Sequence, residues 1–425
     1  MGIKLRLVIM NFLQYAVWGA WLISLGAYLG NTLKFDGLQI GSFFATMGIA
    51  SLFMPAVMGI IADRWIPAQR LLGLCHLFAA GFIPLAATRT DYNSLYTLVL
   101  LSVMFYMPTI ALSNSVAYNA LEKAGLDTVT HFPPIRVWGT VGFICAMWVV
   151  DLGKMGLSAT QLYFSATLGL ILGLYSFTLP NCPINRSGGG KSIVDLLGLR
   201  AFALFKQRKM AIFFIFSMLL GMSLQITNAF ADGYIKSFGD TGIHGAKYLG
   251  TFGVEHSTIL ISLSQISETL CILLIPFFLK RFGIKRVMLI AMFAWVLRFA
   301  LLGAGNPGPG VWMFILSMIV YGVAFDFFNI SGSLFVEKET SAAIRSSAQG
   351  VFMIMTNGIG ATIGTLGAQA VVNRLVYSQQ SAAAQVAGWS QSWLVFAGYA
   401  LVVAVVFALV FRYKHDPHAV EEVNR

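Results

Sequence analysis

Two acidic residues inside long apolar segments are the strongest candidates for chemistry in this sequence. The chain has 17 Asp and Glu residues, and of these only Glu268 and Asp326 lie deep within apolar runs. A charged acid at the centre of a bilayer costs about 2.5–3.5 kcal/mol, so it is expected to face a cavity, pair with a base or carry a proton. Burial also favours the neutral form of a carboxyl group. Both residues are therefore candidate proton carriers, and the alternative is a structural hydrogen bond between helices.

Polar and aromatic residues recur at helical spacing around these acids. Side chains three, four or seven residues apart share one face of a helix. The stripes are Gln14, Trp18 and Trp21; Arg136, Thr140 and Phe143; Gln225, Asn228 and Asp232; Gln265 and Glu268; and Tyr321, Phe325, Asp326 and Asn329. Each stripe predicts a cavity lining or, alternatively, contacts between helices. Arg298 lies in an apolar segment outside these stripes, and the sequence assigns it no partner.

A cavity lined by these stripes would suit a neutral ligand. The stripes combine amides, one arginine, two acids and several aromatic rings, but they lack the cluster of Lys and Arg that binds phosphate groups. Such a set favours a molecule with hydroxyl groups and a flat ring. From the residue types alone, a nucleoside, a sugar and an aromatic drug remain alternatives.

A further motif lies at the end of the second apolar segment, in the string Gly59-Ile-Ile-Ala-Asp63-Arg64. An acid near a helix C-terminus is unfavourable for the helix dipole unless a neighbouring helix N-terminus or an arginine partners it. Gly59, Asp63 and Arg64 therefore predict a conformational latch, an ion pair that breaks and re-forms between states. The alternative is an ordinary solvated charge pair in a loop.

The segments that carry these residues are predicted to be membrane-spanning helices. Hydrophobic residues make up 57% of the chain and charged residues 11%, which excludes an ordinary soluble enzyme. A helix needs about 20 apolar residues to cross a bilayer. Twelve segments meet this requirement: 5–30, 39–62, 71–88, 94–121, 134–151, 160–180, 210–237, 256–279, 287–305, 311–336, 344–373 and 388–411. Continuous apolar runs predict helices, because the strands of a membrane barrel would alternate.

The net charge of +11 follows from the predicted orientation of these segments. With the N-terminus inside, twenty Lys and Arg residues fall on the cytoplasmic side and six on the outer side, as the positive-inside rule requires. Both termini are therefore expected in the cytoplasm, and no nucleic-acid partner is needed to explain the charge. The first segment has no small-residue cleavage site, so we expect a retained span rather than a signal peptide.

The chain is predicted to consist of two six-helix halves, residues 1–180 and 210–425, joined by a cytoplasmic linker at 181–209. The linker contains a run of three glycines and part of a basic cluster. Motifs recur in the same order in both halves; Tyr106 and Tyr321, for example, lie 215 residues apart. Such internal repeats are typical of transporters.

Motifs for catalysis are missing from the sequence. It contains no HExxH or GxSxG string, and its four cysteines are scattered without the spacing of metal ligands. We therefore expect no catalytic residues, no metal and no cofactor, and we do not expect an enzyme.

Four long strings resemble the bacterial nucleoside:proton symporter family of the major facilitator superfamily. They are FPPIRVWGTVGF (132–143), MAIFFIFSMLLGMSLQITN (210–228), SQISETLCILLIPFFLKRFGIK (264–285) and SMIVYGVAFDFFNISGSLFVEKE (317–339). The resemblance implies an all-α membrane protein with twelve transmembrane helices, arranged as two six-helix halves around a central cavity. It implies a multi-pass protein of the bacterial cytoplasmic (inner) membrane that imports nucleosides with protons by alternating access. The alternative is a sugar or drug:proton symporter of the same superfamily.

The resemblance also implies which residues form the site. The substrate-binding residues are expected to be Arg136, Thr140, Phe143, Gln225, Asn228, Gln265, Glu268, Tyr321 and Phe325. Asp326 matches the proton-coupling acid of the family, with Glu268 second. The expected partners are the nucleoside, protons and the lipid bilayer, and the expected state is a monomer. The family has broad and xanthosine-type members, and the segment 111–127 is nearer the xanthosine type.

Overall fold

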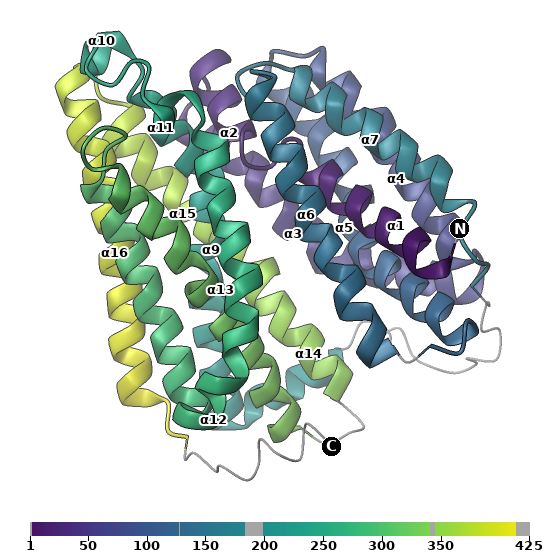
Figure 1. Ribbon diagram of the computed structural model, residues 1–425. Helices are drawn as coiled ribbons and strands as arrows, with labels where there is room; N and C mark the ends of the chain where they lie inside the picture. Colours follow the sequence, from purple (N-terminus) through teal and green to yellow (C-terminus); the bar gives the residue numbers. More distant parts are fainter. Residues whose placement is uncertain (1, 127, 183–198, 341–344, 414–425) are drawn as a thin grey trace. The chain divides into compact units, whose positions relative to one another are not determined.

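The structure, a computed structural model, describes residues 2–126, 128–182, 199–340 and 345–413. These residues form helices and connecting turns, and no strand occurs among them. Figure 1 shows the helices in sequence order from purple to yellow. The elements are α1 (Ile3–Gly19), α2 (Leu25–Ala27), η1 (Tyr28–Thr32), α3 (Gly37–Arg64), α4 (Ala68–Ala87), α5 (Tyr92–Lys123), α6 (Thr128–Leu152), α7 (Thr160–Ser176), η2 (Leu199–Lys206), α9 (Arg208–Ser237), α10 (Thr241–His244), α11 (Phe252–Glu255), α12 (Ser257–Ala304), α13 (Val311–Glu339), α14 (Arg345–Met353), η3 (Ile354–Gly360), α15 (Ala361–Val372), η4 (Asn373–Tyr377) and α16 (Ala382–Val410).

Ten helical segments of the described chain are long and apolar enough to cross a membrane. The two other predicted spans, 5–30 and 160–180, begin with helices that are shorter than expected. Helices α1 and α7 have 17 residues each, below the roughly 20 that cross a bilayer as a straight helix. Helix α1 ends at Gly19, and its predicted span continues through a turn into α2 and η1. The all-helical prediction therefore holds for the described residues.

Helix α12 contains two of the predicted spans in one run of 48 residues. Its regular backbone is interrupted at Gly283, where φ is 74° and ψ is 166°. Residues with a Cβ atom rarely adopt a positive φ, whereas glycine does so readily. The chain therefore turns at Gly283, between the predicted segments 256–279 and 287–305.

The chain divides into two compact units. The first contains residues 1–35 and 42–197, and the second contains residues 36–41 and 198–425. The change from one unit to the other at residues 197 and 198 falls within the predicted linker, 181–209. In the first unit, α1 packs on α6 and α7, and α4 packs on α5 and α7. In the second unit, α12 packs on α13 and α16, and α9 packs on η3 and α15.

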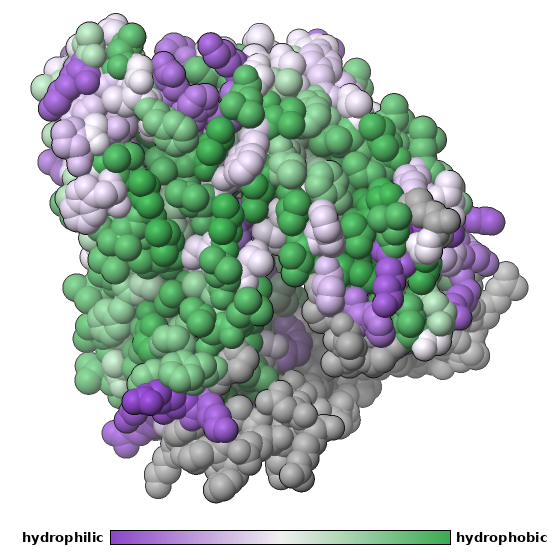
Figure 2. Space-filling view, in the orientation of Figure 1, coloured by the Kyte–Doolittle hydropathy of each residue, from purple (hydrophilic) through white to green (hydrophobic). Residues whose placement is uncertain are grey.

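Large apolar side chains are exposed along the sides of the long helices. Leu273 on α12 is 75% exposed, and Leu409 on α16 is 72% exposed. Figure 2 shows hydrophobic surface along much of the length of the helices of the second unit, with hydrophilic residues concentrated near their ends. Water-soluble proteins rarely expose continuous apolar surface of this kind. The distribution is that of helices that contact lipid along their sides.

Candidate substrate-binding and proton-coupling site

The two predicted proton carriers lie on neighbouring helices of the second unit. Glu268 is on α12 and Asp326 is on α13, and their carboxyl groups are close enough to interact electrostatically. Asp326 is 5% exposed, and its Oδ2 atom is buried without a hydrogen-bond partner among the described residues. Two like charges in a buried site disfavour each other. The pair is therefore well suited to hold a proton.

The backbones of α12 and α13 approach closely next to these acids. A Cβ atom at Gly322 would lie 2.5 Å from the backbone oxygen of Ser267, the residue before Glu268. The hydroxyl group of Ser267 donates a hydrogen bond to the backbone oxygen of Ile319. Small residues allow this kind of close approach between membrane helices. The contact brings the two helices together at the residue before Glu268 and one helical turn before Asp326.

An aromatic platform lies beside the acids on α13. The rings of Tyr321 and Phe325 are stacked, with centroids 5.6 Å apart and an interplanar angle of 4°. The ring of Trp295, on α12, meets Tyr321 edge-on at 6.0 Å. Tyr321 is buried and Phe325 is half-buried. A flat ring of a ligand could stack on such a pair.

The amide residues of α9 form a pair of their own. The side-chain nitrogen of Asn228 donates a 3.0 Å hydrogen bond to Oε1 of Gln225. This bond orients both amides and leaves the Asn228 oxygen and the Gln225 nitrogen for other partners. Asn228 is half-buried, as is Gln265 on α12.

Asp232 shares the predicted stripe of Gln225 and Asn228, but its carboxylate has strong partners within the protein. Its Oδ2 atom forms a 2.7 Å ion pair with Lys236. Its Oδ1 atom accepts a 2.5 Å hydrogen bond from Ser257, at the start of α12. These contacts tie α9 to α12 and give Asp232 a structural role.

In the first unit, the residues of the predicted stripe on α6 pack against α1. The guanidinium carbon of Arg136 lies 3.9 Å from the centre of the Tyr15 ring, a cation–π contact. The ring of Phe143 meets Trp18 edge-on, with centroids 6.3 Å apart. Thr140, between Arg136 and Phe143, is half-buried.

A buried histidine on α4 lies outside the predicted stripes. His76 is fully buried, and its Nε2 atom lies 2.8 Å from Oε1 of Gln14. The Gln14 amide nitrogen donates to Thr109 at 2.7 Å, and the Tyr106 hydroxyl group donates to the Gln14 backbone oxygen at 2.8 Å. A lone histidine in an apolar segment is the only signal in the sequence, because these partners come from two other helices, α1 and α5.

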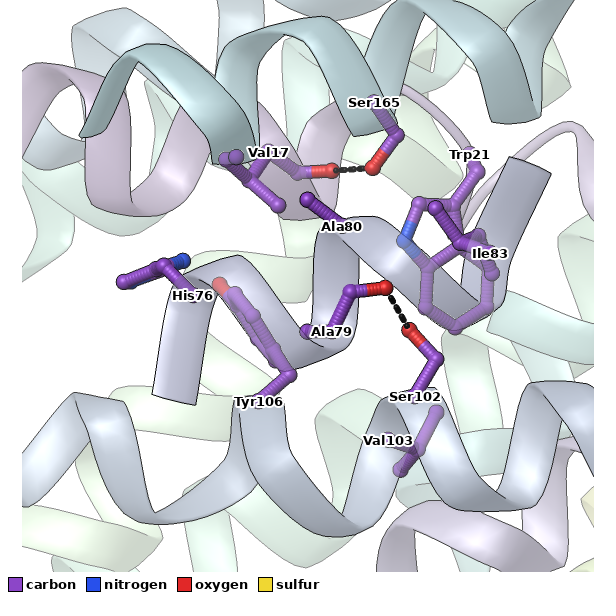
Figure 3. Close-up of a pocket in the computed structure, with 11 residues that line it drawn as sticks. Val17, Trp21, His76, Ala79, Ala80, Ile83, Ser102, Val103, Tyr106 and Ser165 are labelled. Atoms are coloured by element: carbon purple, nitrogen blue, oxygen red, sulfur yellow. Dashed lines mark hydrogen bonds between the residues drawn. The ribbon is translucent and has the colours of Figure 1, made fainter. Parts of the chain in front are cut away.

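Figure 3 shows a small cavity next to His76 and Tyr106. Its volume is about 10 Å³, which suffices for about one water molecule. Apolar groups such as Val17, Trp21 and Ile83 form much of its wall. The cavity is therefore far too small to hold a nucleoside or a sugar.

The predicted latch lies at the end of α3. A Cβ placed on Gly59 would meet no atom of another described element within 4 Å, so none of the described helices packs closely against this position. The side chains of Asp63 and Arg64 lie outside the described residues. Their pairing therefore stays a prediction.

Metal-binding groups do not cluster in the part of the chain that the structure describes. No three His, Cys, Asp or Glu residues there are placed to hold a metal ion.

Comparison with known proteins decides the family. A family model described as "Nucleoside H+ symporter" matches residues 1–416. The chain belongs to this nucleoside:proton symporter family. The nucleoside permease NupG of Escherichia coli K12 is 50% identical over 98% of this chain and 97% of the permease. The xanthosine permease of the same organism is 50% identical over 99% of both chains.

The fold agrees with this membership. The crystal structure of the nucleoside transporter NupG superimposes with a TM-score of 0.89 and covers 97% of this chain and 100% of that one. A bacterial homologue of the lysosomal transporter Spinster is 13% identical with a TM-score of 0.71, and that likeness concerns the fold alone. The similarity of this symporter to known transporters therefore extends over nearly the whole chain.

Proposed function

We propose that this protein is a nucleoside:proton symporter that imports purine or pyrimidine nucleosides, driven by the proton gradient. Besides the family membership, one structural observation supports this proposal. The acid pair, buried Asp326 on α13 and half-buried Glu268 on α12, lies beside the stacked rings of Tyr321 and Phe325, which are both on α13. A proton site and a platform for a flat ring are therefore neighbours.

Substrate recognition is assigned to residues of both units. The base stacks against the Tyr321 and Phe325 pair, because aromatic rings bind other flat rings in offset or parallel arrangements. The amides of Gln225, Asn228 and Gln265 offer donors and acceptors to the ribose hydroxyl groups and the base edge. From the first unit, the assigned residues are Arg136, Thr140 and Phe143.

Proton coupling is assigned to Asp326, with Glu268 as its electrostatic partner. A proton that loads Asp326 from the outside removes one of two like charges, so the loaded carrier closes more easily than the unprotonated one. A membrane potential of about 100 mV contributes about 2.3 kcal/mol for each proton that enters, enough for roughly fifty-fold accumulation. Gly59, Asp63 and Arg64 are assigned to the latch between conformations.

The proposed architecture has twelve transmembrane helices in two six-helix halves, residues 1–180 and 210–425. Both termini and the linker at 181–209 are placed in the cytoplasm, since twenty Lys and Arg residues then lie inside and six outside. The protein is placed in the bacterial cytoplasmic membrane as a monomer.

The test uses the purified protein in proteoliposomes. Radiolabelled uridine or adenosine should accumulate when the outside is acidified, and should exchange by counterflow without a gradient. A panel of nucleosides, free bases, sugars and lipophilic cations then competes for uptake. Nucleosides alone should compete. Competition by a sugar or a lipophilic cation in their place would reject the nucleoside assignment.

A further inference from the structure

Arg298 is a buried cation that the proposed mechanism does not use. It lies in the apolar segment Phe277–Ala304 of the second unit and is only 2% exposed. The ion pairs formed by described residues join Lys209 to Glu339 and Lys236 to Asp232, and neither includes Arg298. A buried charge without an opposite charge is unfavourable. The presence of a cation at this position therefore has to be explained by its contacts.

The guanidinium group is bound by two kinds of partner from α13. Its Nη1 atom donates a 2.7 Å hydrogen bond to the backbone oxygen of Ser317. The Ser317 hydroxyl group donates a 3.0 Å bond back to the Arg298 backbone oxygen. The guanidinium carbon also lies 4.6 Å from the centre of the Tyr321 ring, one helical turn after Ser317. Desolvated cation–π contacts of this kind are among the stronger ones.

Two residues of α12 thus hold the ring of Tyr321. Arg298 contacts the face of the ring, and Trp295, three residues earlier, meets it edge-on. Tyr321 in turn stacks on Phe325, and its hydroxyl group lies in the neighbourhood of both Glu268 and Asp326. The orientation of the ring therefore affects the aromatic platform and the neighbourhood of the acid pair.

We propose that Arg298 is a positioning residue for nucleoside binding, which holds the Tyr321 ring in the orientation that stacks on Phe325. The inference rests on the proposed function, because the platform matters only if a flat base binds there. A purely structural role does not require a cation, since well-packed hydrophobic residues often replace buried ionic groups without loss of stability. The retained cation points to a directional role, fixed by the Ser317 oxygen and the ring face.

The test is a double-mutant cycle on the purified full chain in detergent. Nucleoside Kd is measured by calorimetry for Arg298→Met and Arg298→Lys, each in the natural and the Tyr321→Leu background. Melting temperatures of the same proteins without ligand are recorded. Arg281→Met serves as the matched control, because Arg281 is an exposed arginine of the same helix that contacts the Phe282 ring at 5.8 Å.

Arg298→Met should weaken binding about tenfold in the natural background and less than about twofold with Tyr321→Leu, since the arginine acts through the ring. Arg298→Lys keeps the positive charge but loses the planar guanidinium group. Its Kd in the natural background should therefore lie between those of the natural protein and Arg298→Met. Arg281→Met should leave the Kd unchanged. If Arg298→Met fails to fold, the lysine variant carries the same cycle.

Two results would overturn the inference. One is an unchanged nucleoside Kd in the Arg298 variants, when the natural protein binds nucleosides. The other is an equal loss in both Tyr321 backgrounds, which would show that Arg298 acts on binding without Tyr321. A wild-type protein that binds no nucleoside would overturn the proposed function as well, so the two failures are distinguishable.

Discussion

The carboxyl group of Asp326 interacts electrostatically with that of Glu268, while its Oδ2 atom is buried without a hydrogen-bond partner among the described residues. One carboxyl oxygen of Asp326 therefore lacks a hydrogen bond that would stabilise a negative charge, and Glu268 adds repulsion. This relationship makes protonation of the pair sensitive to either side chain.

Replacement of the neighbour should change the pH response of transport. In Glu268→Gln the nearby negative charge is gone, so Asp326 gives up its proton more easily. The midpoint of proton-driven uptake should therefore move to lower pH, by about one unit. The midpoint is measured as uptake against external pH and is independent of any loss in maximal rate. Glu255→Gln, at an exposed acid on α11, is the control, and a shift of the same size there would refute the assignment.

The aromatic platform should contribute to affinity through its rings. Phe325→Ala removes one ring of the stack and should weaken nucleoside binding about tenfold, because stacking of a base on an aromatic side chain is worth about 1–3 kcal/mol. Phe325→Tyr keeps the ring and should bind nearly normally. Calorimetry with uridine and adenosine measures the Kd. Equal affinity in the alanine variant and the natural protein would exclude Phe325 from the site.

The amide pair on α9 should affect binding and leave the proton coupling intact. Gln225→Ala removes the acceptor that orients Asn228 and should weaken nucleoside binding about five- to tenfold. This is the expected effect of one lost hydrogen bond, worth about 1 kcal/mol, together with the loss of a fixed orientation of the Asn228 amide. The pH midpoint of uptake should not move. The control is Gln380→Ala, at an exposed amide. A shifted midpoint in Gln225→Ala would mean that this residue belongs to the proton pathway.

The His76 network should stabilise the first unit. Gln14→Leu removes the partners of both His76 and Thr109, and an unsatisfied buried polar group costs about 1–3 kcal/mol. The melting temperature of the purified protein should therefore fall, whereas Gln380→Leu should leave it nearly unchanged. An unaltered melting temperature in Gln14→Leu would show that the network contributes little to stability.

The loop after α9 should loosen in acid through His244. The His244 ring stacks on Phe238 at 4.6 Å. Burial lowers the pKa of His244. The negative charge of Asp240 raises this pKa, and the positive charge of Lys247 lowers it further, with a net decrease. The folded loop thus prefers the neutral ring, and this preference is complete above the ordinary pKa of about 6.5 and is lost as the pH falls below it. Hydrogen exchange at residues 241–244 should therefore speed up between about pH 7.5 and about pH 5.5 beyond the intrinsic effect. His244→Phe should abolish this additional acceleration of hydrogen exchange. If the acceleration persists in His244→Phe, another titratable group causes it.

The two acids could be selected from the sequence because an ionisable group in an apolar segment is conspicuous without any knowledge of its neighbours. Glu268 and Asp326 stood out for this reason, and the helix spacing grouped Tyr321 with Phe325 correctly. The partners of Arg298 and His76 could not be predicted, because they come from other helices. Asp232 shows the limit of the stripe argument, since its face on α9 is covered by Ser257 from α12.

The sequence predicts where helices occur better than where each helix ends. The segment 5–30 is apolar throughout, yet α1 ends at Gly19 and the chain turns before α2. Composition records how apolar a segment is, but the local breaks depend on packing against neighbouring helices, which composition does not contain.

The most direct test of proton-coupled nucleoside transport compares Asp326→Asn with the natural protein in proteoliposomes. Asparagine mimics the protonated acid but cannot release a proton. The variant should therefore retain nucleoside counterflow and fail to accumulate nucleoside when the outside is acidified, while the natural protein does both. Uphill accumulation by Asp326→Asn at the natural level, under the same pH gradient, would contradict the assignment of Asp326 as the coupling residue.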